Sequence, residues 1–189
     1  MKNNKNSGFT LIELVVVIVI LAVLAVVALP RFISYQRDAH LARADAAFAS
    51  FESAVQMYHS KWLTEGEPDS TQTVDYGNGD IYPSDTGFPV AVDEIPNPNY
   101  PLRGTDCSKL WNALMNVDLT ISDMDANKPV LPSETDIVAW YNGNNECIYH
   151  YTTGFNEDEK MPLMTYSPKT GDVTISEANN NPNEKPDQP

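Results

Sequence analysis

The fold of this chain is decided by residues 7–14, which read SGFTLIEL, and by the apolar run that follows them. Sixteen consecutive residues from Leu14 to Leu29 are apolar, and an acidic residue, Glu13, stands immediately before them. The mean hydropathy of the whole chain is nevertheless −0.34, because most residues after the run are polar. The sequence therefore predicts a two-part molecule, in which an apolar N-terminal segment is attached to a polar globular part.

The globular part is strongly acidic. The 189 residues include 26 acidic and 12 basic ones, for a formal net charge of −14. Lys2 and Lys5 precede the apolar run, so 10 basic residues stand against 26 acidic ones after Gly8. Such an excess repels a polyanion, and no cluster of lysine and arginine offsets it locally. The composition argues against nucleic acid as a partner and favours solubility outside the cell.

Ordinary explanations of the apolar segment do not account for Glu13. A secretory signal peptide has a charged start, an apolar stretch of about 7–15 residues and a small-residue cleavage site. Residues 26–28, VVA, offer such a site, but the apolar run is long. A plain membrane anchor needs about 20 apolar residues, and residues 9–29 supply 21 with two polar interruptions. A carboxylate at the centre of a membrane helix costs on the order of 2.5–3.5 kcal/mol, so Glu13 indicates a function and requires a partner.

A cut after Gly8 would supply that partner. No lysine or arginine lies between Lys5 and Arg31. Cleavage would create an α-ammonium group on Phe9, one helical turn before Glu13 or on a neighbouring subunit. Glu13 would also lie in the first turn of a helix, where the helix dipole favours a negative charge.

These residues resemble the N-terminus of type IV prepilins. The shared features are a short basic leader that ends in glycine, the motif FTLIEL at residues 9–14, and Pro30 at the end of the apolar run. The resemblance implies that a membrane prepilin peptidase cleaves between Gly8 and Phe9 and methylates the amino group of Phe9. It also implies that Glu13 and Pro30 act in assembly.

The resemblance further implies a structural protein, without cofactor and not an enzyme. Residues 9–30 would hold the subunit in the inner membrane as a single span, with the head in the periplasm and the basic leader in the cytoplasm, as the positive-inside rule predicts. An assembly platform and an ATPase would then build subunits into a helical homo-oligomer, an extracellular type IV pilus (fimbrium) for adhesion or motility. Three alternatives stay open: a type II secretion system pseudopilin, a low-abundance minor pilin or adhesin that binds a surface ligand, and an anchored domain that never polymerises.

The residues after the apolar run predict helices and strands. Residues 31–62 predict an amphipathic helix, because apolar side chains recur at steps of three and four. Residues 63–105 are rich in glycine and proline and predict a long irregular loop. A short helix is expected at residues 105–116, capped by Thr105 or Asp106. Alternation at period two predicts an antiparallel sheet of four strands, at residues 136–141, 146–153, 162–167 and 172–176.

Together these elements predict an α+β chain with the type IV pilin fold. A long N-terminal helix, whose exposed half is hydrophobic, would pack on a small antiparallel β-sheet. A helix over residues 10–62 would be roughly 80 Å long. The expected organisation is a leader peptide at 1–8, an apolar half-helix at 9–30, an amphipathic half-helix at 31–62, a head at 63–176 and a disordered tail at 177–189.

Cys107 and Cys147 are the only cysteines in the sequence. In an exported head they are expected to form one disulfide. A metal site or a catalytic thiol is the alternative, but the spacing of the two cysteines does not make a zinc pattern. The sequences that begin at these cysteines, CSKLW and CIYHY, look similar to the mannose-sensitive haemagglutinin branch of type IV pilins.

No metal site is expected, although one acidic stretch has the spacing of a calcium-binding loop. Lys128 stands where such a loop needs glycine for its sharp turn, so a solvated acidic loop is the preferred interpretation. Residues 75–80, DYGNGD, are a second weak candidate. The possible ligands of the first stretch are Asp123, Asp125, Asn127 and Glu134.

Catalysis is not expected. His40, His59 and His150 are the only histidines, and none lies in a nucleophile or acid–base motif. Four aromatic residues could line a sugar-binding surface, although aromatic residues at strand spacing belong more often to the core: Trp111, Trp140, Tyr149 and Tyr151.

Overall fold

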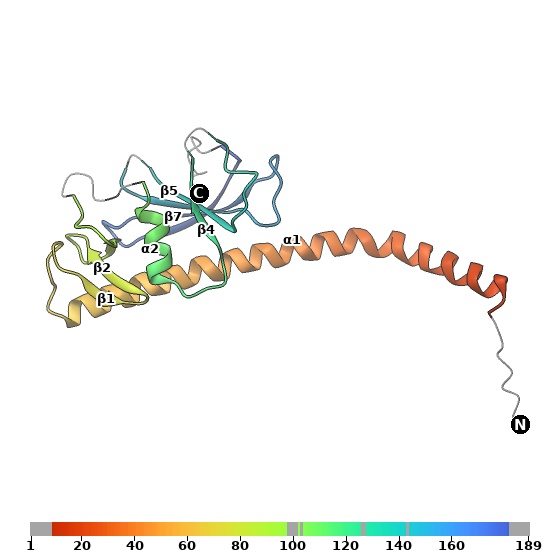
Figure 1. Ribbon diagram of the computed structural model, residues 1–189, viewed down its shortest axis with the longest axis horizontal. Helices are drawn as coiled ribbons and strands as arrows, with labels where there is room; N and C mark the ends of the chain where they lie inside the picture. Colours follow the sequence, from red (N-terminus) through yellow and green to blue (C-terminus); the bar gives the residue numbers. More distant parts are fainter. Residues whose placement is uncertain (1–8, 98–101, 103, 126–127, 143, 182–189) are drawn as a thin grey trace, which may run out of the picture. The chain divides into compact units, whose positions relative to one another are not determined.

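The computed structural model describes residues 9–97, 102, 104–125, 128–142 and 144–181. Its longest element is helix α1 (Leu11–Thr64), which has 54 residues (Figure 1). The chain divides into two compact units, one that ends at Ala39 and one that begins at His40. One helix therefore carries both the apolar N-terminal segment and residues that enter the head.

In the first unit, α1 exposes its apolar side chains. Every side chain from Leu11 to Val27 is exposed, that of Leu11 to 82%. The helical backbone continues through Pro30, so this proline does not end the helix. An apolar surface of this extent marks a site that contacts a membrane or another protein.

In the second unit, α1 buries one stripe of side chains against the head. The stripe follows the predicted steps of three and four, which place its members on one helix face. Leu41 and Trp62, at its two ends, are only partly buried. The fully buried members are Ala44, Phe48, Phe51, Val55 and Tyr58.

Phe51 lies at the centre of an aromatic cluster that joins α1 to the rest of the head. The centroid of its ring lies 5.5 Å from that of Trp111, 5.2 Å from that of Tyr149 and 5.4 Å from that of Tyr166. All four side chains are at most 1% exposed. Full burial of a large apolar side chain contributes roughly 1.5–3 kcal/mol, so this cluster is a main source of the head's stability.

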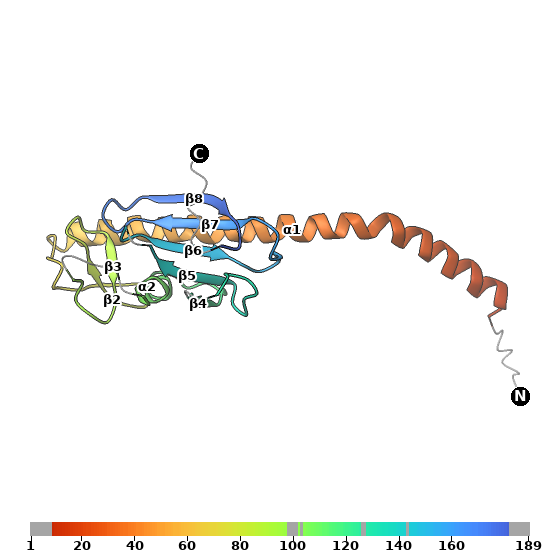
Figure 2. The same cartoon turned by 90° about the horizontal axis from the view of Figure 1, so that it is seen from above.

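The head contains a five-stranded sheet with the order β4-β5-β6-β7-β8 (Figure 2). Strands β5 to β8 pair antiparallel and confirm the four strands predicted from period-two alternation. The sequence did not predict β4, which pairs parallel with β5, because three residues are too few to show a pattern. The strands are β4 (Ile121–Asp123), β5 (Ile137–Tyr141), β6 (Cys147–Tyr151), β7 (Met161–Tyr166) and β8 (Val173–Ala178).

The prediction of a disordered tail from residue 177 was wrong at its start. Strand β8 extends to Ala178, because Glu177 and Ala178 continue the pairing with β7. Asn180 then fastens the chain to the loop before β5, since its amide accepts a hydrogen bond from the N–H of Leu131 and donates one to the carbonyl of the same residue. Residues 182–189 of the predicted tail lie outside the described residues.

The prediction that residues 63–105 form an irregular loop was also wrong in part. They contain a second, three-stranded antiparallel sheet, made of β1 (Val74–Tyr76), β2 (Gly79–Pro83) and β3 (Pro89–Ala91). The turn between β1 and β2 requires Gly77, which has a φ of +64° and approaches the backbone of Ala113. Strands of three to five residues between turns were hidden by the high density of glycine and proline.

Helix α2 (Asp106–Leu114) confirms the short helix predicted at residues 105–116, with slightly narrower bounds. Its buried face includes Leu110, Trp111 and Leu114, as expected. Thr105 occupies the N-cap position, but its side chain makes no capping hydrogen bond.

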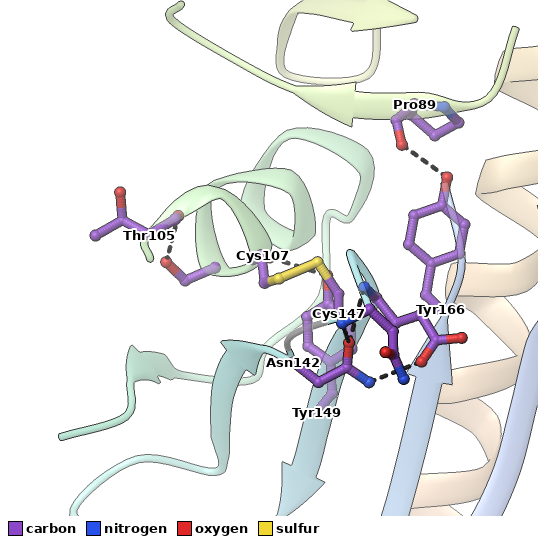
Figure 3. Close-up of a disulfide and its surroundings, with 10 residues drawn as sticks. Pro89, Thr105, Cys107, Asn142, Cys147, Tyr149 and Tyr166 are labelled. Atoms are coloured by element: carbon purple, nitrogen blue, oxygen red, sulfur yellow. Dashed lines mark hydrogen bonds between the residues drawn. A yellow bond between two sulfur atoms is a disulfide. The ribbon is translucent and has the colours of Figure 1, made fainter. Parts of the chain in front are cut away.

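The expected disulfide joins α2 to β6 (Figure 3). The sulfur atoms of Cys107 and Cys147 are 2.04 Å apart, and both residues are fully buried. The hydroxyl of Tyr149, two residues after Cys147, donates a hydrogen bond of 2.9 Å to the carbonyl of Cys107. A covalent bond and a hydrogen bond therefore fasten the start of α2 to the same strand.

Replacement of both cysteines by alanine is expected to lower the free energy of unfolding by about 4 kcal/mol, because the disulfide closes a loop of about forty residues in the unfolded chain. Urea unfolding of the full chain in detergent micelles, followed by tryptophan fluorescence, measures the loss. The control is the wild-type chain with a thiol reductant but no urea, which should stay oxidised because both cysteines are 0% exposed. A loss below about 1 kcal/mol would contradict this role of the disulfide.

Candidate functional site

The candidate site is the start of α1, where Phe9, Thr10 and Glu13 lie. Phe9, the residue that would follow the predicted cut, is 86% exposed. Gly8 lies outside the described residues. The first helical backbone bond runs from the N–H of Leu14 to the carbonyl of Thr10, at 3.3 Å. Thr10 is therefore the residue from which the helix starts.

Thr10 and Glu13 form a reciprocal capping box. The backbone N–H of Thr10 donates to Oε2 of Glu13 at 2.8 Å, and the hydroxyl of Thr10 donates to the same oxygen at 2.7 Å. The N–H of Glu13 in turn donates to the hydroxyl oxygen of Thr10, at 3.3 Å. The residues T-L-I-E at positions 10–13 match the sequence of such a box. This local structure accounts for a glutamate at the head of an apolar helix.

The capping box fixes the position of the Glu13 carboxylate at the start of the helix. Both hydrogen bonds to its carboxylate end at Oε2, and Oε1 accepts none within the part of the chain that the structure describes. The carboxylate also lies in the first helical turn, where the macrodipole favours a negative charge. Glu13 is thus held in place by Thr10 of its own chain, through one of its two carboxylate oxygens.

The helix that follows is long and apolar enough to cross a membrane. The window Leu11–Ala28 has 18 residues with a mean hydropathy of 3.3, and none of it is buried within the protein. It is the one such helix among the described residues. Length and composition alone do not separate a membrane span from a signal sequence, so the function of this helix depends on the motif at its start.

The weak metal candidates are not brought together by the structure. Asp123 ends β4, and Asp125 forms an ion pair of 3.3 Å with Lys128. Asn127 lies outside the described residues, and Glu134 belongs to the loop before β5. In the described ranges, no group of three or more histidine, cysteine, aspartate or glutamate side chains could hold a metal ion. Asp75 and Asp80, the second candidate, lie opposite each other in the β1–β2 hairpin.

A hollow that the sequence did not predict lies beside Asp136, just before β5. It has a volume of about 460 Å³ and is lined mainly by polar residues, including Thr120 and Thr153. The hydroxyls of these two threonines donate to the two carboxylate oxygens of Asp136, at 2.9 and 2.6 Å. Burial raises the pKa of Asp136, but these bonds and the nearby guanidinium of Arg43 outweigh it and hold the pKa below its usual value. Asp136 therefore fastens three segments of the head, and its lone pairs are used inside the protein.

The four aromatic residues that could have lined a sugar-binding surface belong mostly to the core. Three of them are at most 1% exposed: Trp111, Tyr149 and Tyr151. The hypothesis that these three line a sugar-binding surface is therefore wrong. Trp140 is partly buried and stacks on His150, with ring centroids 4.8 Å apart. Trp140 differs from the other three aromatic residues in being partly exposed. Period-two alternation does not predict such a difference in exposure.

Comparison with known proteins identifies only the N-terminal segment. A family model described as the prokaryotic N-terminal methylation motif matches residues 3–29, which include Gly8, Phe9 and Glu13. The match is consistent with the type IV prepilin signal that residues 7–14 resemble. No curated protein and no solved structure matches the chain. The resemblance to the mannose-sensitive haemagglutinin branch is not tested and stays a prediction.

Replacement of Thr10 by valine should loosen the first turn of α1, because it removes the hydroxyl from the capping box while keeping the shape of the side chain. The expected cost is about 1 kcal/mol. Amide hydrogen exchange in detergent micelles measures it as faster exchange at Glu13 and Leu14. The matched control, Thr10→Ser, keeps the hydroxyl and should exchange like the wild type. Equal exchange in both variants would show that the capping box does not hold the helix start.

Proposed function

We propose that this chain, whose N-terminal motif supports a type IV pilin-like or pseudopilin precursor, is the structural subunit of a type IV pilus. In this proposal a prepilin peptidase cuts between Gly8 and Phe9 and methylates the new amino group. The mature subunits then polymerise into a surface fibre for adhesion or motility. The observation that carries the proposal is Glu13, fixed by a capping box at the start of an exposed apolar helix within the matched motif.

The proposed mechanism begins in the inner membrane. The apolar window Leu11–Ala28 spans the bilayer, and Lys2 and Lys5 stay in the cytoplasm by the positive-inside rule. The disulfide-bonded head is then periplasmic, where disulfides form and persist. This topology also places the scissile bond at the cytoplasmic side of the membrane.

Assembly then exchanges lipid for protein around the apolar helix. Lipid tails are as apolar as the side chains between Leu14 and Val27, so burial of these side chains in a fibre gives little net drive. The proposal therefore includes an assembly platform and an ATPase that supply the work of extraction. Helix packing alone tolerates several registers. The pairing of Glu13 with the Phe9 ammonium group of a neighbouring subunit would select one, because a charge-assisted bond formed away from water is strong and directional.

Two alternatives share the same N-terminus and the same processing. A type II secretion system pseudopilin would form a short periplasmic structure, and the resemblance implies that its head usually lacks a disulfide, unlike this head. A minor pilin or adhesin would be a rare component of the fibre and would bind a surface ligand. Abundance and location separate the three functions.

The deciding experiment is to shear the cell surface, collect fibres and identify the N-terminal peptide and the abundance of this chain by mass spectrometry. Abundant chain that starts at methylated Phe9 is the expected result. Mature chain that remains in the membrane or periplasm would favour the pseudopilin, and rare mature chain in fibres the minor pilin. A start at Met1 or Leu29 would overturn the assignment.

Replacement of Gly8 by a bulky residue such as leucine should block cleavage, because the resemblance implies that the peptidase requires glycine before the cut. An immunoblot of whole cells is expected to show the unprocessed band, with no chain in sheared fibres. Asn4→Gln is a matched control in the same leader that leaves the cut site and both lysines unchanged and should be processed. Normal maturation of Gly8→Leu would contradict the proposed cut.

Replacement of Glu13 by alanine should give subunits that are processed but do not assemble, because the partner of the Phe9 ammonium is lost. Glu13→Gln keeps the size and can accept the hydrogen bonds of Thr10, so its failure would identify the charge as the cause. Glu52→Ala removes an exposed carboxylate from the same helix outside the motif and should still assemble. Normal fibre yield from Glu13→Ala would exclude this function of Glu13.

A further inference from the structure

The two faces of the five-stranded sheet differ in whether their buried polar side chains form hydrogen bonds. The inner face, which carries Tyr149 and Tyr166, packs against Phe51 of α1. Residues next to these along each strand point to the opposite, outer face. In the pairing of β6 with β7, Ile148 lies opposite Thr165 and His150 lies opposite Leu163. Six of the buried or half-buried residues on this face form what we call the outer-face cluster: Trp140, Ile148, His150, Leu163, Thr165 and Ala178.

His150 is buried in this cluster without a hydrogen bond. The residue is 1% exposed, and neither Nδ1 nor Nε2 has a hydrogen-bond partner among the residues that the structure describes. One face of the ring is covered by Trp140, whose ring plane is tilted by only 18° from it. Thr165, on the neighbouring strand, also has a buried hydroxyl oxygen that makes no hydrogen bond within the described part of the chain. Three buried polar atoms on adjacent strands are therefore unsatisfied, each at a cost in folding free energy.

The protonation state of His150 follows from this environment. A neutral imidazole leaves one donor and one acceptor unpaired, whereas an imidazolium would leave two donors and a full charge unpaired. The second state is far more costly, because an uncompensated charge in an apolar environment loses its hydration. We infer that His150 makes the outer face of the sheet an acid-sensitive element, which is compatible with the fold only while the ring is neutral and which opens the head when it gains a proton.

Acidic groups on the elements around His150 do not offset the proton. Asp136 and Glu146 share its face of the sheet by strand alternation. The carboxylate of Asp136 is bonded to Thr120 and Thr153, and that of Glu146 accepts a hydrogen bond from Asn142. On the other side, β7 carries no acidic or basic residue, Lys160 precedes it, and Glu177 of β8 alternates to the opposite face. Consistent with this, burial lowers the pKa of His150 to about 3.

The sign of the pH dependence follows from linkage. An unfolded histidine has its ordinary pKa of 6.5, so below that pH the unfolded chain binds a proton that the folded chain excludes. The contribution of His150 to stability is therefore present above pH 6.5 and is lost as the pH falls from 6.5 toward 3. Between pH 7.5 and 4.5 the unfolding equilibrium constant should rise about 100-fold from this residue alone.

The test compares variants of the full chain in detergent micelles by urea unfolding at pH 7.5 and 4.5, followed by tryptophan fluorescence. His150→Leu keeps the volume and cannot titrate. The ratio of the wild-type unfolding constant to that of His150→Leu should be about 100-fold larger at pH 4.5 than at pH 7.5. His150→Gln keeps a polar group but does not titrate, and it should lose the same pH dependence. A ratio that does not change with pH in either variant overturns the inference.

Thr165→Val is the matched control. It removes an unsatisfied polar atom of the same cluster without removing a titratable group, so it should lower the unfolding constant by the same factor at both pH values. An NMR titration of labelled His150 in the folded wild type needs no variant to fold. A ring that stays neutral until the chain unfolds supports the inference, and one that titrates near pH 6.5 in the folded chain overturns it. Neither result depends on whether the protein forms a fibre.

Discussion

The head depends on one constraint, the burial of the aromatic stripe of α1. Phe51 lies within 5.5 Å, centroid to centroid, of rings from α2, β6 and β7. These three elements come from distant parts of the chain, and a shared apolar side chain is what makes their separate positions cooperative. Removal of that ring would leave a cavity whose lining belongs to three elements, whereas Met57, on the exposed side of the same helix, packs against little.

The two parts of α1 differ in how their apolar side chains are distributed around the helix, although they belong to one helix. Beyond His40 the helix has the usual stripe, with one face buried and the other polar. Before Ala39 the residues from Leu11 to Val27 are apolar on every side except at Glu13, although all of them are exposed. A helix that is apolar on every side is typically buried, in a membrane or inside a protein. The capping box resolves the one exception locally, because it gives the carboxylate hydrogen bonds before any partner arrives. In the proposed fibre, the ammonium group of a neighbouring subunit would add a charge-assisted contact to a carboxylate that is already positioned.

The parts of the fold that could be predicted are those with strong periodicity or specific chemistry. The steps of three and four placed Phe48, Phe51 and Val55 in the core, and alternation gave β5 to β8. Short elements could not be predicted, because β1, β3 and β4 have three residues each and depend on tertiary pairing. At the candidate site the sequence supplied Glu13 and the need for a partner. The capping function of Thr10 was not predicted, although the spacing T-x-x-E is the sequence signal of a capping box.

The inner and outer faces of the main sheet show how differently one sheet can satisfy polar groups. On the inner side, the hydroxyls of Tyr149 and Tyr166 donate to the carbonyls of Cys107 and Pro89, at 2.9 and 2.7 Å. Tyr58 of α1 does the same with the carbonyl of Ile81. Each bond is long-range in sequence, so these polar groups specify which elements meet as well as avoiding a penalty. The ring of His150, by contrast, makes no hydrogen bond to another described residue. We therefore infer that the gain of a single proton on the outer face is enough to destabilise the head.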